Sequence, residues 1–169
     1  MREKVGDSAT AGGGEVPRPR YKIMLVTSPG GHLTQLVRLR EWWEHHERVW
    51  VCSDTLQTAS MLENEDVIHG HFPTTRNLPN LLRNLVLAVT VLRRERPDVI
   101  ISTGAGIAVP FLYVARLLRI RTVFLEVFDR VDSATMTGRL CHPVVDLFLL
   151  QWPEQQPFYR RGVVVGTLW

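Results

Sequence analysis

Short apolar runs recur along the chain and are separated by stretches of mixed polarity. The runs are rich in valine, isoleucine and leucine, and they predict strands buried on both faces, as in a parallel sheet that helices cover on both sides. A further run, residues 67–72, predicts either a third strand or an extended loop. The clearer runs are residues 23–26, 48–52, 98–102, 121–125, 146–150 and 163–166.

The stretches between these runs have helical spacing. In residues 33–45, apolar side chains recur every three or four positions beside charged ones, which predicts an amphipathic helix that packs on the sheet. The longest helical pattern, residues 78–96, ends at Pro97 because proline has no N–H group and its ring clashes with the preceding turn. Shorter helices are predicted after the capping residues 53–55 and over residues 111–118, 134–141 and 154–159.

Strands and helices therefore alternate, with short connections between them. This order predicts an α/β fold, namely a single Rossmann-like domain with a doubly wound, mostly parallel sheet and right-handed crossovers. The chain has 169 residues, which is enough for one such domain. Residues 1–20 are polar and glycine-rich and are expected to form a disordered tail, so the folded domain is expected over residues 21–169.

The composition argues against several classes of protein. Apolar residues make up 45% of the chain and charged residues 22%, as in soluble globular domains. No apolar run is long enough for a transmembrane helix, and the polar start is unlike a signal peptide. The formal charge of +3 is too small to argue for a nucleic-acid partner. Cys52 and Cys141 lie far apart and in no metal-ligand spacing, which indicates a reducing, cytosolic compartment rather than a disulfide scaffold.

A glycine turn follows two of the predicted strands. The first is Ser28-Pro-Gly-Gly-His32 and the second is Thr103-Gly-Ala-Gly106, and each leads into a predicted helix. Glycine lets a ligand approach the main chain, and the N–H groups of a helix's first turn attract anions, so two such turns suit a diphosphate. Neither turn has the G-x-G-x-x-G fingerprint or the Walker lysine, which argues against a dehydrogenase and a P-loop NTPase.

Polar side chains are expected at the same edge of the sheet as these turns, because the carboxyl ends of parallel strands share one edge. His32 is expected there either as a general base on a sugar hydroxyl or a hydrogen-bond donor to a phosphate, or as a histidine that caps the helix. Glu126 follows an apolar strand and either fixes or deprotonates an acceptor hydroxyl, or forms an ion pair with Arg130 or Arg139. Arg130 and Asp132 are expected either to bind the phosphate and the sugar of a ligand or to bind each other.

The helix predicted over residues 78–96 has apolar residues over more of its circumference than one packing face needs. It is either an ordinary sheet-covering helix or a helix whose outer face lies in a lipid interface, with arginines on anionic head groups. The residues by themselves favour the first interpretation. The flanking arginines that would face a membrane are Arg76, Arg83, Arg93 and Arg94.

Five motifs, in their order along the chain, resemble those of the membrane-side subunit of the split UDP-N-acetylglucosamine transferase of N-glycan assembly, and of the PssD-like bacterial exopolysaccharide glycosyltransferase subunits. The chain is also similar to the N-terminal half of the MurG-type transferases. The resemblance covers residues 22–166. The motifs are Ser28-Pro-Gly-Gly-His32, Ser102-Thr-Gly-Ala-Gly106, Glu126 with Arg130-Val131, Ser133 with Thr137-Gly138, and Gln151-Trp152.

The resemblance implies the acceptor-binding half of a GT-B glycosyltransferase. A separate partner subunit would bind the UDP-sugar donor, and neither a cofactor nor a metal is implied. The acceptor would be a lipid-linked diphosphate saccharide. His32 and Glu126 would activate or orient its hydroxyl. The residues implied to hold its diphosphate are Gly30, Gly31, Thr103, Gly104 and Gly106, and those implied to contact the acceptor or the partner are Arg130, Ser133 and Trp152.

The resemblance also implies peripheral attachment to the cytoplasmic face of the plasma membrane, which favours the interfacial interpretation of residues 78–96. Two features depart from the family: the start is polar where the eukaryotic subunits carry a membrane anchor, and Pro29 stands where many relatives have a smaller residue. Two alternatives stay open. In the first, the chain is a non-catalytic scaffold that recruits and activates a catalytic partner. In the second, it is a nucleotide-sugar enzyme such as an epimerase, and the missing dinucleotide fingerprint counts against this alternative.

Overall fold

Seven parallel strands form one sheet in the computed structural model, which describes residues 19–168; the predicted tail lies almost entirely outside the described residues. The order is β3-β2-β1-β4-β5-β6-β7, so the direction of winding reverses between β1 and β4. Ligands of such sheets bind at this switch point, beyond the carboxyl ends of the strands. The strands are β1 (Lys22–Val26), β2 (Glu47–Cys52), β3 (Val67–His69), β4 (Val99–Ser102), β5 (Arg121–Leu125), β6 (Leu147–Leu150) and β7 (Gly162–Val164).

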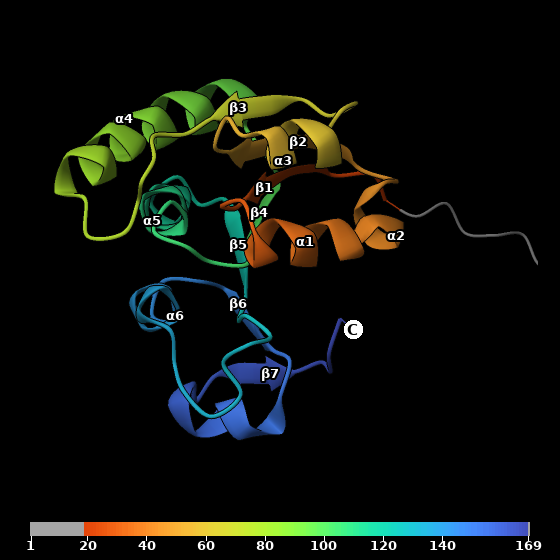
Figure 1. Ribbon diagram of the computed structural model, residues 1–169, viewed down its shortest axis with the longest axis vertical. Coiled ribbons are helices and arrows are strands. Elements are labelled where there is room, and N and C mark those ends of the chain that lie inside the picture. The colour runs from red at the N-terminus through yellow and green to blue at the C-terminus, as the bar shows by residue number, and fades with distance from the viewer. Residues whose placement is uncertain (1–18, 169) are drawn as a thin grey trace, which may run out of the picture.

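Helices cover both faces of the sheet, which confirms the predicted doubly wound fold (Figure 1). Helices α4, α5 and α6 pack on one face, and α1, α2 and α3 pack on the other. The helices are α1 (Gly31–Arg38), α2 (Arg40–Trp43), α3 (Leu56–Met61), α4 (Leu78–Glu95), α5 (Ala108–Leu117), α6 (Met136–Cys141) and the 3-10 helix η1 (Pro153–Phe158).

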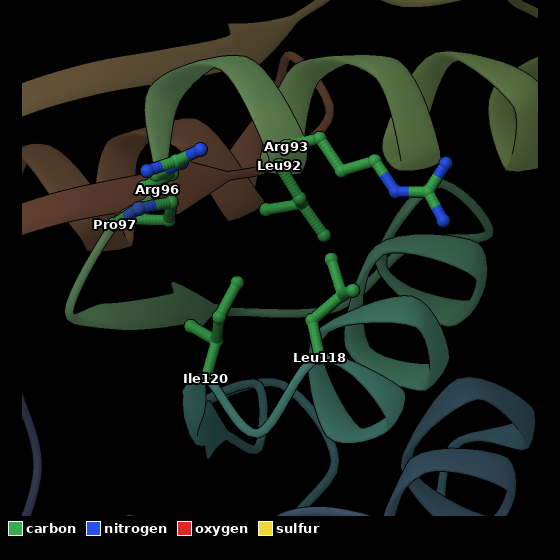
Figure 2. Close-up of a pocket in the computed structure, with 6 residues that line it drawn as sticks. All are labelled: Leu92, Arg93, Arg96, Pro97, Leu118 and Ile120. Atoms are coloured by element: carbon green, nitrogen blue, oxygen red, sulfur yellow. The ribbon is translucent and has the colours of Figure 1, made fainter.

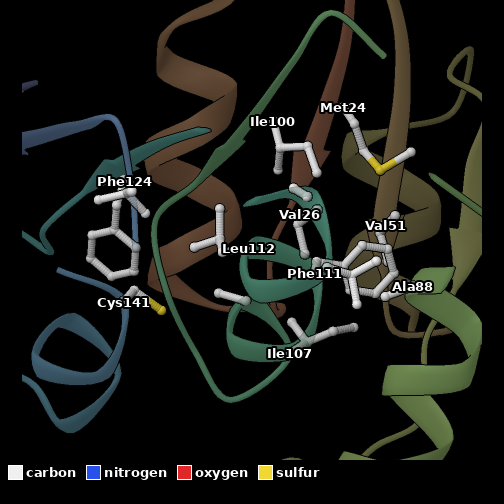
Figure 3. Packing of buried hydrophobic residues seen from close by; sticks show 14 of the residues in the cluster. Met24, Val26, Val51, Ala88, Ile100, Ile107, Phe111, Leu112, Phe124 and Cys141 are labelled. Atoms are coloured by element: carbon white, nitrogen blue, oxygen red, sulfur yellow. The ribbon is translucent and has the colours of Figure 1, made fainter. Parts of the chain in front are cut away.

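Each face of the sheet has its own hydrophobic core. On the α4–α5 face, Phe111 of α5 lies beside Val26 of β1 and Val51 of β2, and Ala88 of α4 closes the cluster (Figure 3). On the α1 face, the rings of Trp43 and Trp50 meet edge to face with centroids 5.5 Å apart. Cys52 and Cys141 are both free thiols buried among these apolar residues. Burial raises the pKa of the Cys141 thiol to about 12, so it is a poor nucleophile.

The structure corrects several predicted boundaries. The helix predicted over residues 33–45 is two helices, because the backbone leaves helical geometry at Leu39. Its first helix begins at Gly31, so His32 lies within the first turn. Helix α5 begins at Ala108 and includes Pro110, which a first turn tolerates because its N–H groups have no intrahelical acceptor. The run 67–72 is a strand only over Val67–His69.

Candidate functional site

The first glycine turn joins β1 to α1 at the switch point of the sheet. Gly30 has a φ of 86°, a conformation that glycine adopts without strain, and its N–H donates to Gln57 Oε1 at 2.7 Å. One amide predicted to face a diphosphate is therefore already bound by a side chain of α3. A Cβ on either Gly30 or Gly31 would meet no atom within 4 Å, but the Gly30 N–H is already bound. The open approach to the main chain is thus at Gly31, at the start of α1.

The second glycine turn joins β4 to α5 and is shaped by contacts within the protein. The Gly104 N–H donates to Ser102 Oγ at 3.0 Å, and the residue has a φ of 109°. A Cβ on Gly106 would come within 2.8 Å of the Thr74 carbonyl oxygen. Thr103 is buried, and its place among the diphosphate-binding residues stays a prediction. Its role is to tie the two turns together.

His32 lies between the two turns, and its ring is held in one tautomer. Its Nδ1 is 2.9 Å from the Thr103 carbonyl oxygen, and the Thr103 hydroxyl donates to the His32 carbonyl oxygen at 3.0 Å. Because a carbonyl oxygen only accepts, Nδ1 carries the proton and Nε2 is the basic nitrogen of the neutral ring. This hydrogen bond orients the ring toward the pocket at the edge of the sheet, as a general base requires.

Two small cavities meet at His32. One has a volume of about 150 Å³ and is bounded by the second glycine turn and by the loop that follows β5, including Asp129 and Arg130. The other, of about 320 Å³, is bounded by Gly31, Gln35 and the same loop. His32 and Arg130 thus line one cavity together, as predicted for neighbours at this edge of the sheet. Asp129, which the sequence reasoning did not single out, lines both cavities.

Glu126 lines neither cavity at His32, so its predicted role as a catalytic carboxylate stays a prediction. Its side chain is 0% exposed and accepts hydrogen bonds from the Tyr159 hydroxyl, the Thr135 hydroxyl and the Val127 N–H. The alternative ion pairs with Arg130 or Arg139 are also absent among the described residues. Glu126 anchors the start of α6, through Thr135, and the end of η1, through Tyr159, to the end of β5.

Burial raises the pKa of the Glu126 carboxyl above its ordinary value, against the opposing effect of its hydrogen bonds from Tyr159, Val127 and Thr135. The folded state therefore holds the proton over a pH range in which the unfolded chain has released it. The resulting stabilisation is complete below the unfolded pKa and is lost as the pH rises through the folded pKa.

We expect Glu126→Gln to flatten the pH dependence of the free energy of unfolding, because one group contributes at most about 1.4 kcal/mol per pH unit within that window. Urea unfolding between about pH 4 and pH 8 measures this, with the wild type losing stability as the pH rises above about 4.3, the usual value for Glu. The exposed Glu63 offers the matched control Glu63→Gln, which should keep the wild-type slope. Equal slopes for all three proteins would contradict the prediction.

The other predicted contact residues have distinct surroundings. Arg130 is exposed, whereas Ser133 is half-buried and lines neither cavity at His32. Trp152 packs against the Phe128 ring with centroids 5.1 Å apart, and its Nε1–H donates to the Phe128 carbonyl oxygen at 2.8 Å. Trp152 therefore packs against the loop that follows β5 and stabilises it. Within residues 19–168, no three His, Cys, Asp or Glu side chains are placed to hold a metal ion.

Helix α4 exposes an apolar face near this site. Leu82 is 55% exposed and Val86 is 68% exposed, while Val91 and Leu92 are buried against the sheet. An apolar groove of about 600 Å³ runs between the start of α4 and α6. None of the helices in the described chain has the length and apolar character needed to cross a membrane. The groove is lined by residues of the preceding loop, α4, α5 and α6, including Arg76, Leu78, Leu81, Gly106, Val109, Met136 and Leu140.

The arginines predicted to face a membrane fall at both ends of α4. Arg76 lines the apolar groove, and Arg83 donates to Asn80 Oδ1 at 3.2 Å. Arg94 pairs with Glu95 at 2.6 Å in the last turn. Arg93 lines a separate cavity of about 360 Å³.

That separate cavity lies at the opposite edge of the sheet from His32. Figure 2 shows Leu92, Leu118 and Ile120 pointing toward one another between the end of α4 and the turn that enters β5. Pro97 precedes β4 and Ile120 precedes β5, so the cavity is at the amino ends of the strands. Its position excludes it from the site at His32.

Solved structures of other proteins share this fold. MurG of Acinetobacter baumannii superposes with a TM-score of 0.71 at 19% identity, over 86% of this chain and 45% of that chain. The UDP complex of MnaA from S. aureus gives a TM-score of 0.70 at 13% identity, over 88% of this chain and 45% of that one. These similarities show the fold, and the chain spans less than half the length of either structure.

Curated relatives match nearly the whole chain. A protein of Yarrowia lipolytica is 25% identical over 89% of this chain and 84% of its own length, and a human protein is 24% identical over 90% and 85%. Both are named UDP-N-acetylglucosamine transferase subunit ALG14. The likeness to bacterial exopolysaccharide subunits stays a prediction. The family model described as "Oligosaccharide biosynthesis protein Alg14 like" matches residues 23–168, and the chain belongs to that family.

Proposed function

We propose that this chain is the acceptor-binding and membrane-recruiting subunit of a two-component glycosyltransferase in polysaccharide biosynthesis. It binds a lipid-linked diphosphate saccharide at the cytoplasmic face of the plasma membrane, and a partner subunit supplies the UDP-sugar. The observation that carries the proposal is the placement of His32, fixed in one tautomer between two glycine turns at the switch point of the sheet.

The acceptor diphosphate binds at the start of α1, where Gly31 leaves the main chain open and the first-turn N–H groups attract an anion. The acceptor hydroxyl lies toward His32 Nε2, in the cavity bounded by Asp129 and Arg130. As the hydroxyl oxygen bonds to the anomeric carbon of the donor, the bond from that carbon to UDP breaks and UDP leaves. The hydroxyl proton passes to Nε2, and the configuration at the anomeric carbon is inverted.

The names of the curated relatives support a separate donor subunit. The chain corresponds to less than half of MurG and MnaA, and its curated relatives are named as subunits of a transferase. The test is transfer from UDP-N-acetylglucosamine to a lipid-linked diphosphate sugar, measured with and without the partner. Full activity from this chain alone would contradict the proposal of a separate donor subunit.

Membrane recruitment is supported by the exposed apolar face of α4. We expect the double variant Leu82→Asp, Val86→Asp to lose vesicle binding at least about tenfold, because burial of each side chain contributes about 1.5–3 kcal/mol. Cosedimentation with vesicles that contain anionic lipid measures the loss. The matched control is Leu56→Asp, since Leu56 is 91% exposed on α3, on the other face of the sheet. Equal vesicle binding by both variants would show that α4 does not contact the membrane.

A second candidate is a non-catalytic scaffold that recruits and activates the partner. The burial of Glu126 favours it, because one of the two predicted chemical groups is then structural. The two candidates differ in what they require of His32, and the variant His32→Ala separates them.

A further inference from the structure

Three buried glutamine side chains bind the main chain of the loop that follows β5. Gln35 is 4% exposed, Gln151 is 1% exposed and Gln155 is 0% exposed. Gln35 comes from α1, whereas Gln151 follows β6 and Gln155 lies in η1, at least 116 residues later in the sequence. Their amide groups converge on residues 126–130, the loop that bounds both cavities at His32.

Gln155 binds two carbonyl groups of this loop. Its Nε2 donates to the Val127 oxygen at 3.1 Å and to the Arg130 oxygen at 2.9 Å. Its Oε1 accepts from the N–H groups of Gln151 at 2.9 Å and Trp152 at 3.2 Å. Every polar atom of the side chain therefore has a partner, and the loop is held at both of its ends.

Gln151 and Gln35 connect the same loop to the helix that carries His32. Gln151 Nε2 donates to the Glu126 carbonyl oxygen at 2.9 Å and to Gln35 Oε1 at 2.6 Å. Gln35 Oε1 also accepts from the Phe128 N–H at 3.1 Å. Because Gln35 lies one helical turn after His32 on α1, the network sets the distance between His32 and the loop.

The loop has no regular secondary structure of its own to satisfy these main-chain groups. A buried peptide group without a hydrogen-bond partner costs about 1–3 kcal/mol, so the loop depends on side chains from elsewhere. A fully satisfied buried network of this kind specifies one conformation. Here the conformation in question places Asp129 and Arg130 across from His32.

We propose that Gln35, Gln151 and Gln155 are positioning residues for glycosyl transfer, which hold residues 127–130 against His32 so that the acceptor hydroxyl meets its base. This inference rests on the proposed function. Gln151 and Gln155 line neither cavity at His32 and act through the loop, while Gln35 bounds the larger cavity and also binds the loop.

The test compares variants of similar side-chain length in the complete complex. Gln151→Met and Gln155→Met remove the donors to the loop, and we expect kcat/KM for the acceptor to fall roughly tenfold to hundredfold, as for a small misplacement of a bound group. The KM for the UDP-sugar should stay unchanged, since the partner binds it. Gln156→Met is the matched control on η1, because Gln156 Nε2 donates to the carbonyl oxygens of Tyr159 and Gly162, outside the loop.

A variant at Gln35 tests the network from the side of α1. Gln35→Met removes the side-chain oxygen that accepts from the Phe128 N–H and from Gln151 Nε2. We expect faster hydrogen exchange at the Phe128 amide and lower kcat/KM for the acceptor in Gln35→Met, and no change in either for the control Gln156→Met.

The outcomes distinguish a failure of the proposed function from a failure of the positioning role. A wild-type complex without transfer activity would contradict the proposed function, while the exchange of the Phe128 amide would still report on the loop. An active wild type with unchanged acceptor kcat/KM in Gln151→Met, Gln155→Met and Gln35→Met would overturn the positioning role. Equal exchange at the Phe128 amide in Gln35→Met and the wild type would also overturn it.

Discussion

Replacing His32 with alanine is expected to lower the turnover of glycosyl transfer by roughly a hundredfold to ten-thousandfold, the usual contribution of a general base. The tautomer set by the Thr103 carbonyl oxygen leaves Nε2 as the proton acceptor, and alanine offers none. The initial rate with saturating UDP-sugar and acceptor measures the loss. Gel filtration of the purified pair shows whether the complex still assembles.

Two further variants sharpen this result. His32→Gln keeps an amide that can donate to the Thr103 carbonyl oxygen but has no basic nitrogen, so we expect a loss of turnover close to that of His32→Ala. His45→Ala is the control, because His45 is exposed between α2 and β2, at the opposite edge of the sheet. Unchanged turnover in His32→Ala with an assembled complex would rule out the base and favour the scaffold function.

Gly138→Ala is expected to lower the free energy of unfolding by about 2–4 kcal/mol. A Cβ at this position in α6 would overlap Glu126 Oε2 and the Tyr159 hydroxyl and would lie 2.8 Å from Thr135 Oγ1. One of these buried groups must move and lose its hydrogen bond, which outweighs the gain in helix propensity of about 1 kcal/mol. Urea unfolding of the wild type and the variant measures the difference.

Gly31→Ala is the matched glycine control. It sits at the start of α1 with no atom within 4 Å of a Cβ, so we expect its stability to stay within about 0.5 kcal/mol of the wild type. Its methyl group would instead obstruct the approach of a diphosphate to the main chain. A Gly138→Ala protein as stable as the wild type would show that the Glu126 cluster can rearrange at little cost.

The architecture was accessible from local patterns. Apolar runs of four to six residues alternate with amphipathic helices, and this order leaves few alternatives to a doubly wound parallel sheet. The edge that carries the site followed from the same reasoning, because carboxyl ends of parallel strands meet at one edge. His32 and Arg130 were placed near each other in this way, and they do line one cavity.

Helix ends were less accessible. The break at Leu39 and the early start of α5 at Ala108 depend on how each helix meets the sheet. Pro110 suggested a boundary by its chemistry, yet it fits within a first turn. Local propensity therefore predicted which segments are helical, but it did not predict the residues at which the helices begin and end.

By itself, the sequence determined the alternation of elements, the two glycine turns and the set of polar residues at the strand ends, since these depend on neighbours within a few positions. Only the tertiary structure decided which of those polar groups line the cavities at that edge. Glu126 is buried because Tyr159, 33 residues later, closes over it, and Gln35 reaches the loop after β5 from a helix 93 residues earlier. Such contacts have no local signature, because burial is a property of the packed chain and not of the residue.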